Sequence, residues 1–142
     1  MNQCILDTDQ LSLFQRGHEV VVPRVLSYPT GSVVITVVSV EEQVRGRLAY
    51  ISRAKKTPEL LKAYWWLRHS IIELNRFPIL EFDEAAQLQF ERLKSLKIRV
   101  GTPDLRIAAI ALATDSVLVT RNRQDFDAIP SLTLADWSQP PL

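Results

Sequence analysis

Short runs of apolar residues alternate along the chain with longer stretches of helical periodicity. The runs that are candidates for strands lie at residues 4–6, 32–38, 78–82, 116–120 and 131–137. The second run, SVVITVV, is dense in β-branched residues and has no polar alternation, which is typical of a strand that is covered on both faces. This alternation predicts an α/β fold in which helices flank a central parallel sheet of four to five strands.

The stretches between these runs carry signals of helix starts. Thr8 or Asp9 is suitably placed to cap the first helix, and Ser39 and Glu42 have the spacing of a capping box at the start of another. In the longest helix Thr57 is the expected cap, ahead of a proline in the first turn. Helices are expected at 9–14, at 19–28, after residue 39, at 57–75, at 84–98 and at 102–113.

Length and composition are those of an ordinary globular protein. The 142 residues predict a single domain over 1–142. The 17 basic and 16 acidic residues leave a net charge of +1, so no global field indicates a nucleic-acid partner. Cys4 is the only cysteine, which excludes a disulfide within the chain. Neither a signal peptide nor a membrane-spanning run is visible, and we expect a cytoplasmic location without membrane contact.

Four acidic residues lie beside the ends of predicted strands or helices. They are spread over most of the chain, at Asp7, Glu42, Asp104 and Asp125. Because a parallel sheet brings the ends of sequence-distant strands to one edge, these carboxylates are expected to converge there. Their mutual repulsion would require a compensating cation, and Mg²⁺ or Mn²⁺ is the natural choice for an all-oxygen site. The pattern therefore predicts a metal-dependent hydrolase.

Each of these acids also has a purely structural interpretation. Asp104 is favoured in the first turn of a helix by the helix dipole, and Asp7 and Asp125 are possible caps of the helices beside them. Glu42 has the capping-box role already given. The adjacent residues Trp65 and Trp66 point about 100° apart on a helix. We expect them to serve core packing together with a protein interface.

Five segments, in their order along the chain, resemble the PIN domain. They are ILDTD, SVEEQVRG, GTPDLRIAAIAL, VLVTRNRQDF and IPSLTLADW, and they are most similar to the VapC-type toxins of bacterial toxin–antitoxin pairs. The resemblance implies a three-layer sandwich and a Mg²⁺- or Mn²⁺-dependent ribonuclease. It also implies an antitoxin partner that masks the acidic cleft, and a homodimer, for which the Leu- and Trp-rich helix 57–74 offers modest support.

Carried over by position, the resemblance assigns the metal ligands. Asp7 in the LDT motif, Glu42 in E-x-x-x-G and Asp104 in D-x-x-I-A-A match the family's acids. Many PIN domains have a fourth acid where this chain has Asn122, and Asp125 matches the acid of a T-x-N-x-x-D-F variant. We favour Asp125, supported by Asn122, as a ligand of a second metal ion or as a ligand that acts through water. The choice between Asp125 and Asn122 as the fourth site residue stays open, and so does the number of metal ions.

Further residues are predicted to position the substrate. Thr8 and Thr120 are expected to orient carboxylates or the scissile phosphate through their hydroxyl groups. Asn122 would support Asp125, and Arg121 and Arg123, like the arginines at 45 and 47, are candidates for contacts with RNA phosphates. For all four arginines, an ordinary solvated side chain is the competing interpretation.

Two other functions fit parts of the sequence. Asn122, in place of an acid, favours a metal-free PIN-fold module that binds RNA or protein. A phosphatase or response-regulator-like domain also groups acids at strand ends, but it requires a lysine after a later strand, and VLVTRNR has none. Metal-dependent cleavage of RNA is therefore the leading hypothesis.

Overall fold

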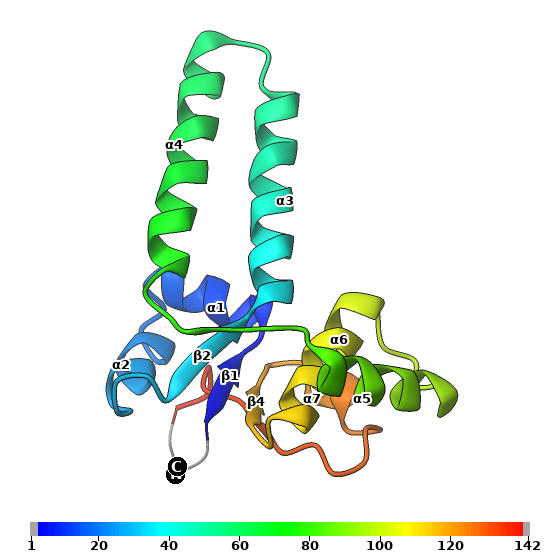
Figure 1. Ribbon diagram of the computed structural model, residues 1–142. Helices are drawn as coiled ribbons and strands as arrows, with labels where there is room; N and C mark the ends of the chain where they lie inside the picture. Colours follow the sequence, from blue (N-terminus) through cyan, green and yellow to red (C-terminus); the bar gives the residue numbers. More distant parts are fainter. Residues whose placement is uncertain (1–2, 141–142) are drawn as a thin grey trace.

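The computed structural model describes residues 3–140. Within them, five strands form one parallel sheet in the order β3-β2-β1-β4-β5, so that the first strand of the chain lies at its centre (Figure 1). The strands are β1 (Cys4–Leu6), β2 (Val33–Thr36), β3 (Ile79–Leu80), β4 (Val117–Val119) and β5 (Leu134–Ala135). In register, Cys4 pairs with Val33 on one side and with Val117 on the other. The predicted α/β fold with a central parallel sheet is confirmed.

Helices cover both faces of this sheet and complete a three-layer arrangement. They are α1 (Thr8–Gln15), α2 (Val21–Leu26), α3 (Val37–Arg53), α4 (Thr57–Leu74), α5 (Glu84–Ser95), α6 (Thr102–Ala113) and α7 (Arg123–Phe126). Residues of α1, α2 and the end of α4 pack on one face, whereas α5, α6 and α7 pack on the other.

The two faces bury separate cores, because successive strand residues point to opposite sides of a sheet. In β1, Cys4 and Leu6 belong to the core beneath α1 and α2, whereas Ile5 belongs to the core beneath α5 and α6. In β4, Leu118 and Val119 divide in the same way. Since burying one aliphatic side chain contributes roughly 1.5–3 kcal/mol, the two cores hold β1 and β4 firmly. Their carboxyl ends are therefore fixed positions for any residues that follow them.

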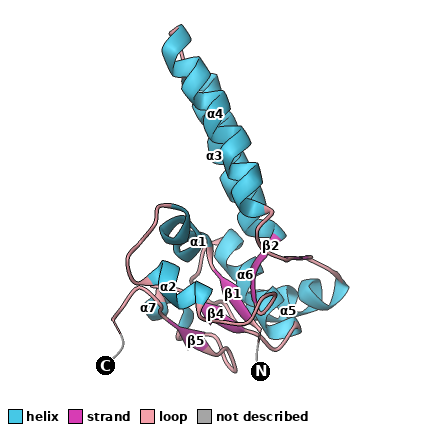
Figure 2. Cartoon of the chain, turned by 90° about the vertical axis from the view of Figure 1, so that its left-hand side faces the viewer, coloured by secondary structure: helices cyan, strands magenta, loops and turns pink. Residues whose placement is uncertain are grey.

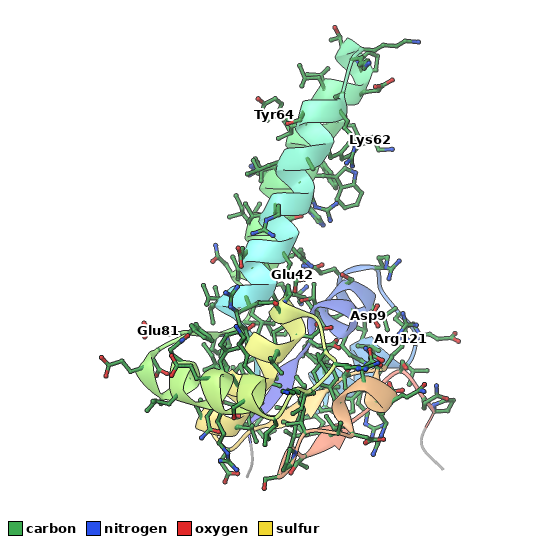
Figure 3. The ribbon with its side chains drawn as sticks, turned by 90° about the vertical axis from the view of Figure 1, so that its right-hand side faces the viewer. Asp9, Glu42, Lys62, Tyr64, Glu81 and Arg121 are labelled. Carbon is green, nitrogen blue, oxygen red and sulfur yellow. The ribbon has the colours of Figure 1, made fainter. Side chains whose placement is uncertain are left out.

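Helices α3 and α4 project from this body as a two-helix hairpin (Figures 1 and 2). The buried residues of the hairpin lie mainly at its foot, such as Val38 and Gln43 in α3 and Leu74 in α4. Farther out, Lys62 and Tyr64 are exposed and far from the sheet (Figure 3). Across residues 3–140, no helix is both long and apolar enough to span a membrane.

The boundary between β2 and α3 differs from the prediction. The run at 32–38 does not remain a strand to its end, because α3 begins at Val37. The hydroxyl of Thr36 accepts a hydrogen bond from the Ser39 N–H at 3.2 Å and caps the helix. The predicted capping box of Ser39 and Glu42 is therefore wrong, and Glu42 lies in the second turn.

Of the three residues considered as the cap of α1, the structure selects Asp7, since its Oδ1 accepts the Gln10 N–H at 2.8 Å, and Thr8 and Asp9 are excluded. Two other predicted caps are wrong. The long hairpin helix has Lys56 in the cap position, so Thr57 is already helical. Asp125 lies within α7 instead of capping it. The expected core packing fails for Trp65, which is 52% exposed.

Candidate functional site

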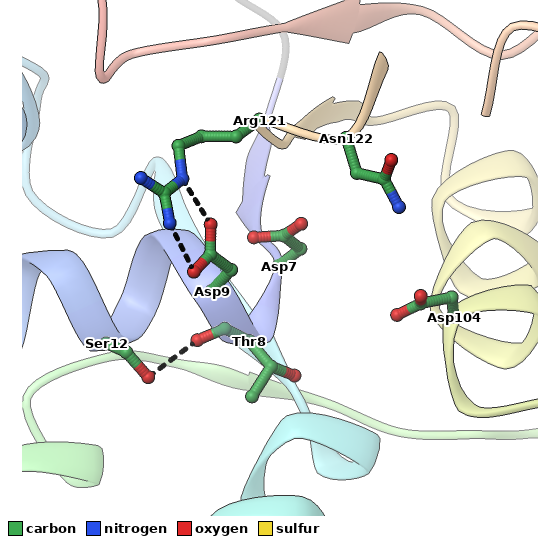
Figure 4. A pocket seen from close by; sticks show the side chains of 7 residues that line it. All are labelled: Asp7, Thr8, Asp9, Ser12, Asp104, Arg121 and Asn122. Atoms are coloured by element: carbon green, nitrogen blue, oxygen red, sulfur yellow. Dashed lines mark hydrogen bonds and ion pairs between the residues drawn. The ribbon is translucent and has the colours of Figure 1, made fainter. Parts of the chain in front are cut away.

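An open cavity of about 570 Å³ lies at the carboxyl edge of the sheet. The ends of β1 and β4 and the first turns of α1 and α6 bring its walls together (Figure 4). It is lined by Asp7, Thr8, Asp9, Ser12, Asp104, Arg121 and Asn122. Five of these residues were predicted as site residues, namely Asp7, Thr8, Asp104, Arg121 and Asn122. The fold brings them together although Asp7 and Asn122 lie 115 residues apart in the chain. We call this cavity the acidic pocket.

Asp7 is the most buried carboxylate of the pocket, with 5% of its surface exposed. It follows β1 directly, and burial raises its pKa to about 6. Hydrogen bonds from the Thr120 side chain and the Gln10 N–H oppose this rise, whereas the charges of Asp9 and Asp104 add to the rise in pKa. The buried carboxyl thus has a fixed direction but an incompletely compensated charge.

Asp104 extends from the first turn of α6 toward Asp7 across the pocket (Figure 4). Burial raises the pKa of its carboxyl, and the negative charges of Glu42 and Asp125 raise the pKa further. No side chain caps α6, whose cap residue is Gly101. The charges of Glu42 and Asp125 thus act on Asp104, and the charge of Asp104 acts on Asp7, although the four acids come from separate parts of the chain.

Glu42 and Asp125 lie at the margin of the pocket rather than in its lining. The Thr8 hydroxyl donates to Glu42 Oε1 at 2.6 Å and lies 2.9 Å from the Ser39 hydroxyl. The Asn122 side-chain amide donates to Asp125 Oδ2 at 2.8 Å. Each marginal acid is thus oriented by a polar residue that does line the pocket, which is the kind of support that a metal ligand needs.

Thr120 and the arginines after β4 occupy different environments. Thr120 is fully buried and its hydroxyl accepts the Asn122 N–H at 2.9 Å. Arg121 lines the pocket, but its guanidinium donates to both carboxylate oxygens of Asp9 at 2.6 and 2.9 Å (Figure 4). Arg123 is exposed at the start of α7 and outside the pocket lining. Arg121 is therefore already paired, so only part of its charge is open to a substrate.

Two supporting residues were missed by the sequence analysis. Gln10 is fully buried, donates from Nε2 to Asp136 at 2.9 Å and leaves its Oε1 without a hydrogen-bond partner in the described structure. Asp9 was considered only as a helix cap. Neither contact has a local signal, because the partners Asp136 and Arg121 lie more than a hundred residues away along the chain.

The donor chemistry of the pocket fits a hard divalent cation. Its carboxylates, hydroxyls and side-chain amide offer only oxygen as ligand atoms near Asp7 and Asp104, as Mg²⁺ and Mn²⁺ prefer. The raised pKa values of these two carboxyls record a repulsion that a cation would relieve. In the part of the chain that the structure describes, however, no three His, Cys, Asp or Glu side chains are already grouped closely enough to hold an ion.

The parallel sheet and the helices on both of its faces define a PIN-like α/β fold. The chain is similar to the toxin-antitoxin structure VapBC2 from Rickettsia felis bound to a promoter DNA fragment, with a TM-score of 0.71 and 24% identity over 94% of this chain and 98% of that one. It is also similar to DNA-bound VapBC from Salmonella typhimurium, with a TM-score of 0.75 and 21% identity over 96% and 99%. These similarities show the fold.

Two curated proteins are similar in sequence, whereas no family model matches. Ribonuclease VapC2 of Rickettsia felis is 32% identical over 72 residues, which cover 48% of this chain and 54% of the relative. The tRNA(fMet)-specific endonuclease VapC of Salmonella typhimurium is 31% identical over 68 residues, covering 45% and 52%. The chain thus spans about half the length of the curated relatives it matches. The resemblance to VapC-type PIN domains is confirmed.

Proposed function

We propose that this protein is a metal-dependent endoribonuclease and the toxin of a type II toxin–antitoxin pair. The observation that carries the proposal is the convergence of Asp7 and Asp104 on one pocket, with Glu42 and Asp125 hydrogen-bonded to its lining residues Thr8 and Asn122. Like charges gathered at the edge of a sheet destabilise the fold unless they serve a ligand. The names of the two curated relatives, a ribonuclease and an endonuclease, support the reaction class.

The proposed ligands of the divalent ion are Asp7 and Asp104, with Glu42 and Asp125 completing the set directly or through water. Bound Mg²⁺ or Mn²⁺ supplies an activated water and charge relief at the phosphodiester. The Thr8 hydroxyl fixes the position of one oxygen of the Glu42 carboxylate. The Asn122 side-chain amide fixes one oxygen of the Asp125 carboxylate in the same way. Thr120 and the Gln10 N–H fix the orientation of the Asp7 carboxyl.

Cleavage of RNA by matched aspartate variants tests this proposal. Asp104→Asn should reduce Mn²⁺-stimulated cleavage by more than about a hundredfold, beyond the loss typical of a residue that only supports a ligand. Asp127→Asn is the matched control, because Asp127 is exposed at the end of α7 and outside the pocket lining. Equal cleavage by the two variants, in preparations free of other nucleases, would rule out the proposed site.

A metal-free binding module is the second candidate. It is favoured by Asn122 in a position where many PIN domains have an acid, and by the absence of a ready-made group of three ligands within residues 3–140. RNA binding that is unaffected by Mn²⁺, together with an absence of cleavage, would support this module.

The partners proposed for the chain are an antitoxin and a second copy. The similar structures include a toxin-antitoxin complex from Klebsiella pneumoniae, which supports the first. For the second, α4 carries exposed apolar side chains, namely Leu60, Leu61, Tyr64, Trp65, Ile71 and Ile72. Light scattering on the purified chain should show a dimer, and Leu61→Glu, at a position that is 66% exposed, should shift it to the monomer. A monomer in the unsubstituted chain would refute the homodimer.

A further inference from the structure

Two further cavities adjoin the acidic pocket along α1. One, of about 460 Å³, is lined by Asp9, Ser12, Gln15, Arg16, Arg47, Trp66, His69, Ser70 and Glu73. The other, of about 350 Å³, is lined by Thr8, Ser12, Glu42, Gln43, Gly46, Arg47, Tyr50 and Arg53. Ser12 lines all three cavities, and Arg47 lies between the two outer ones. We call the two outer cavities together the arginine groove.

The charges of the arginine groove are unevenly paired. Its arginines, Arg16, Arg47 and Arg53, form no ion pair with any carboxylate in residues 3–140. Of its acids, Asp9 is paired with Arg121 and Glu73 is paired with Arg76, which leaves Glu42 as the one groove carboxylate without an ion pair among the described residues. Three unpaired arginines against one unpaired carboxylate leave the groove with an excess of positive charge, beside a pocket whose carboxylates leave an excess of negative charge.

Arg47 is held in place at the centre of this groove. Its Nε donates to the buried Ser70 hydroxyl at 2.7 Å, and its guanidinium carbon lies 4.9 Å from the centre of the Trp66 ring. Its Nη atoms form no hydrogen bond with a residue that the structure describes. A guanidinium that is oriented through one nitrogen and open at the others is well suited to a phosphate group.

Gly46 leaves room beside Arg47. It lies in the middle of α3, where glycine is less stable than alanine by roughly 0.5–1 kcal/mol. A Cβ atom added there would meet nothing within 4 Å, so neighbouring atoms do not require the glycine. The space it leaves is part of the groove.

We propose that the arginine groove binds the single-stranded RNA next to the cleavage site. Phosphates on one side of the scissile bond would contact Arg47, Arg16 and Arg53, while a base packs against the aromatic side chains Trp66 and Tyr50 that line the cavities. The missing side chain at Gly46 lets the strand approach α3. This inference rests on the proposed ribonuclease function and adds the residues that hold the substrate.

Fluorescence anisotropy of a short labelled single-stranded RNA tests the groove without relying on cleavage. All variants carry Asp104→Asn to prevent turnover. Arg47→Ala should weaken binding by about tenfold and lower the slope of log K against log salt by about 0.7, as expected for one lost phosphate contact. Tyr50→Ala, which removes an aromatic side chain that forms neither a hydrogen bond nor a cation–π contact with Arg47 in the described structure, should weaken binding with the slope unchanged. Arg45→Ala is the control, because Arg45 lies on the same helix but is exposed and paired with Glu41.

Gly46→Leu tests the space beside Arg47. A Cβ atom at this position meets nothing within 4 Å, and leucine favours a helix more than glycine does. RNA binding should fall by at least about tenfold, as expected when a bulky group blocks contacts to a phosphate and a base. Thermal unfolding should show an equal or higher midpoint. If Gly46→Leu and Arg47→Ala both bind RNA as tightly as the chain without these substitutions, the proposal that the groove binds RNA is wrong.

Two controls separate this inference from its alternatives. Cleavage of RNA by the chain without Asp104→Asn tests the ribonuclease itself. If that chain cleaves RNA but Arg47→Ala binds like Arg45→Ala, the groove is refuted while the proposed function stands. If an acidic polyglutamate peptide displaces the RNA at equal concentration, the site is a general anion or protein site and the RNA assignment is overturned. Weak competition by the peptide supports RNA.

Discussion

The acidic pocket and the α3–α4 hairpin are held in place in different ways. The pocket residues follow β1 and β4 or begin α6, and these elements are anchored by two buried cores. The hairpin is buried mainly at its foot and exposes large apolar side chains along α4. Like charges can be kept together only by a rigid support, whereas an exposed helical surface is free to recognise partners. The fold thus separates proposed chemistry from proposed recognition.

Truncating one buried and one exposed isoleucine tests this difference between the body and the hairpin most strongly. Ile107 in α6 is fully buried, and Ile107→Ala should lower the free energy of unfolding by about 2–5 kcal/mol. Ile71 in α4 is 46% exposed, and Ile71→Ala should change it by less than about 0.5 kcal/mol. Urea denaturation measures both. Similar losses would show that the hairpin is as essential to stability as the body.

The second prediction concerns the cost of the buried charge at Asp7. Its folded pKa of about 6 lies above the ordinary value of 3.8, so the native state binds the proton more tightly. The stabilisation that comes from this tighter proton binding is complete below the pKa of Asp7 in the unfolded chain. It is lost as the pH rises through about 6. At pH 8, with a chelator present, Asp7→Asn should therefore raise the free energy of unfolding by roughly 2–3 kcal/mol.

The asparagine retains the cap of α1, because its side-chain oxygen can accept the Gln10 N–H. At pH 4 the variant and the unsubstituted chain should differ little. Urea denaturation at the two pH values gives the comparison, and a destabilised variant at pH 8 would show that the Asp7 charge is compensated within the fold.

A smaller effect is expected from the residue that orients Glu42. Thr8→Val removes the hydroxyl that donates to Glu42 at 2.6 Å while keeping the shape of the side chain. Mn²⁺ affinity should fall by about tenfold, as is typical when the residue that supports a ligand is lost. Ser52→Ala is the control, because the Ser52 hydroxyl bonds only a helix carbonyl on the hairpin. Calorimetric affinities that do not differ between the two variants would remove Thr8 from the site.

The smallest effect is expected at the ion pair on the rim of the pocket. Arg121 and Asp9 are 48% and 43% exposed, so solvent screens their attraction. Arg121→Ala should lower the free energy of unfolding by no more than about 1 kcal/mol. A thermal melt against Arg45→Ala provides the measure. A loss well above that of the control would indicate that Arg121 also compensates the buried Asp7.

The fold and the separate acids could be predicted because their signals are local. Apolar runs mark the strands, and Asp7 and Asp104 stand beside element ends whose position in a parallel sheet is known in advance. The caps were harder to predict, since Thr36 and Ser39 are equally suitable in sequence. Thr36 is the cap because β2 ends at this residue and α3 begins directly after it.

The supporting contacts could not be predicted, because they join distant parts of the chain. Nothing near Asp9 indicates that Arg121 will neutralise it, and nothing near Gln10 indicates Asp136. The arginine groove likewise depends on the foot of the hairpin lying against α1, which brings Arg47 beside Ser12. Such contacts follow from the packing of whole elements and leave no pattern in the sequence.

Calorimetric titration of Mn²⁺ tests most directly whether the acids form a metal site. The unsubstituted chain should bind Mn²⁺ and release protons at pH 6, because the pKa of Asp7 is about 6 and metal ligands must be deprotonated. Asp104→Asn should lose this binding, and Asp127→Asn should retain it. Binding of Mn²⁺ that is the same in all three proteins, or absent from the unsubstituted chain, would contradict the account.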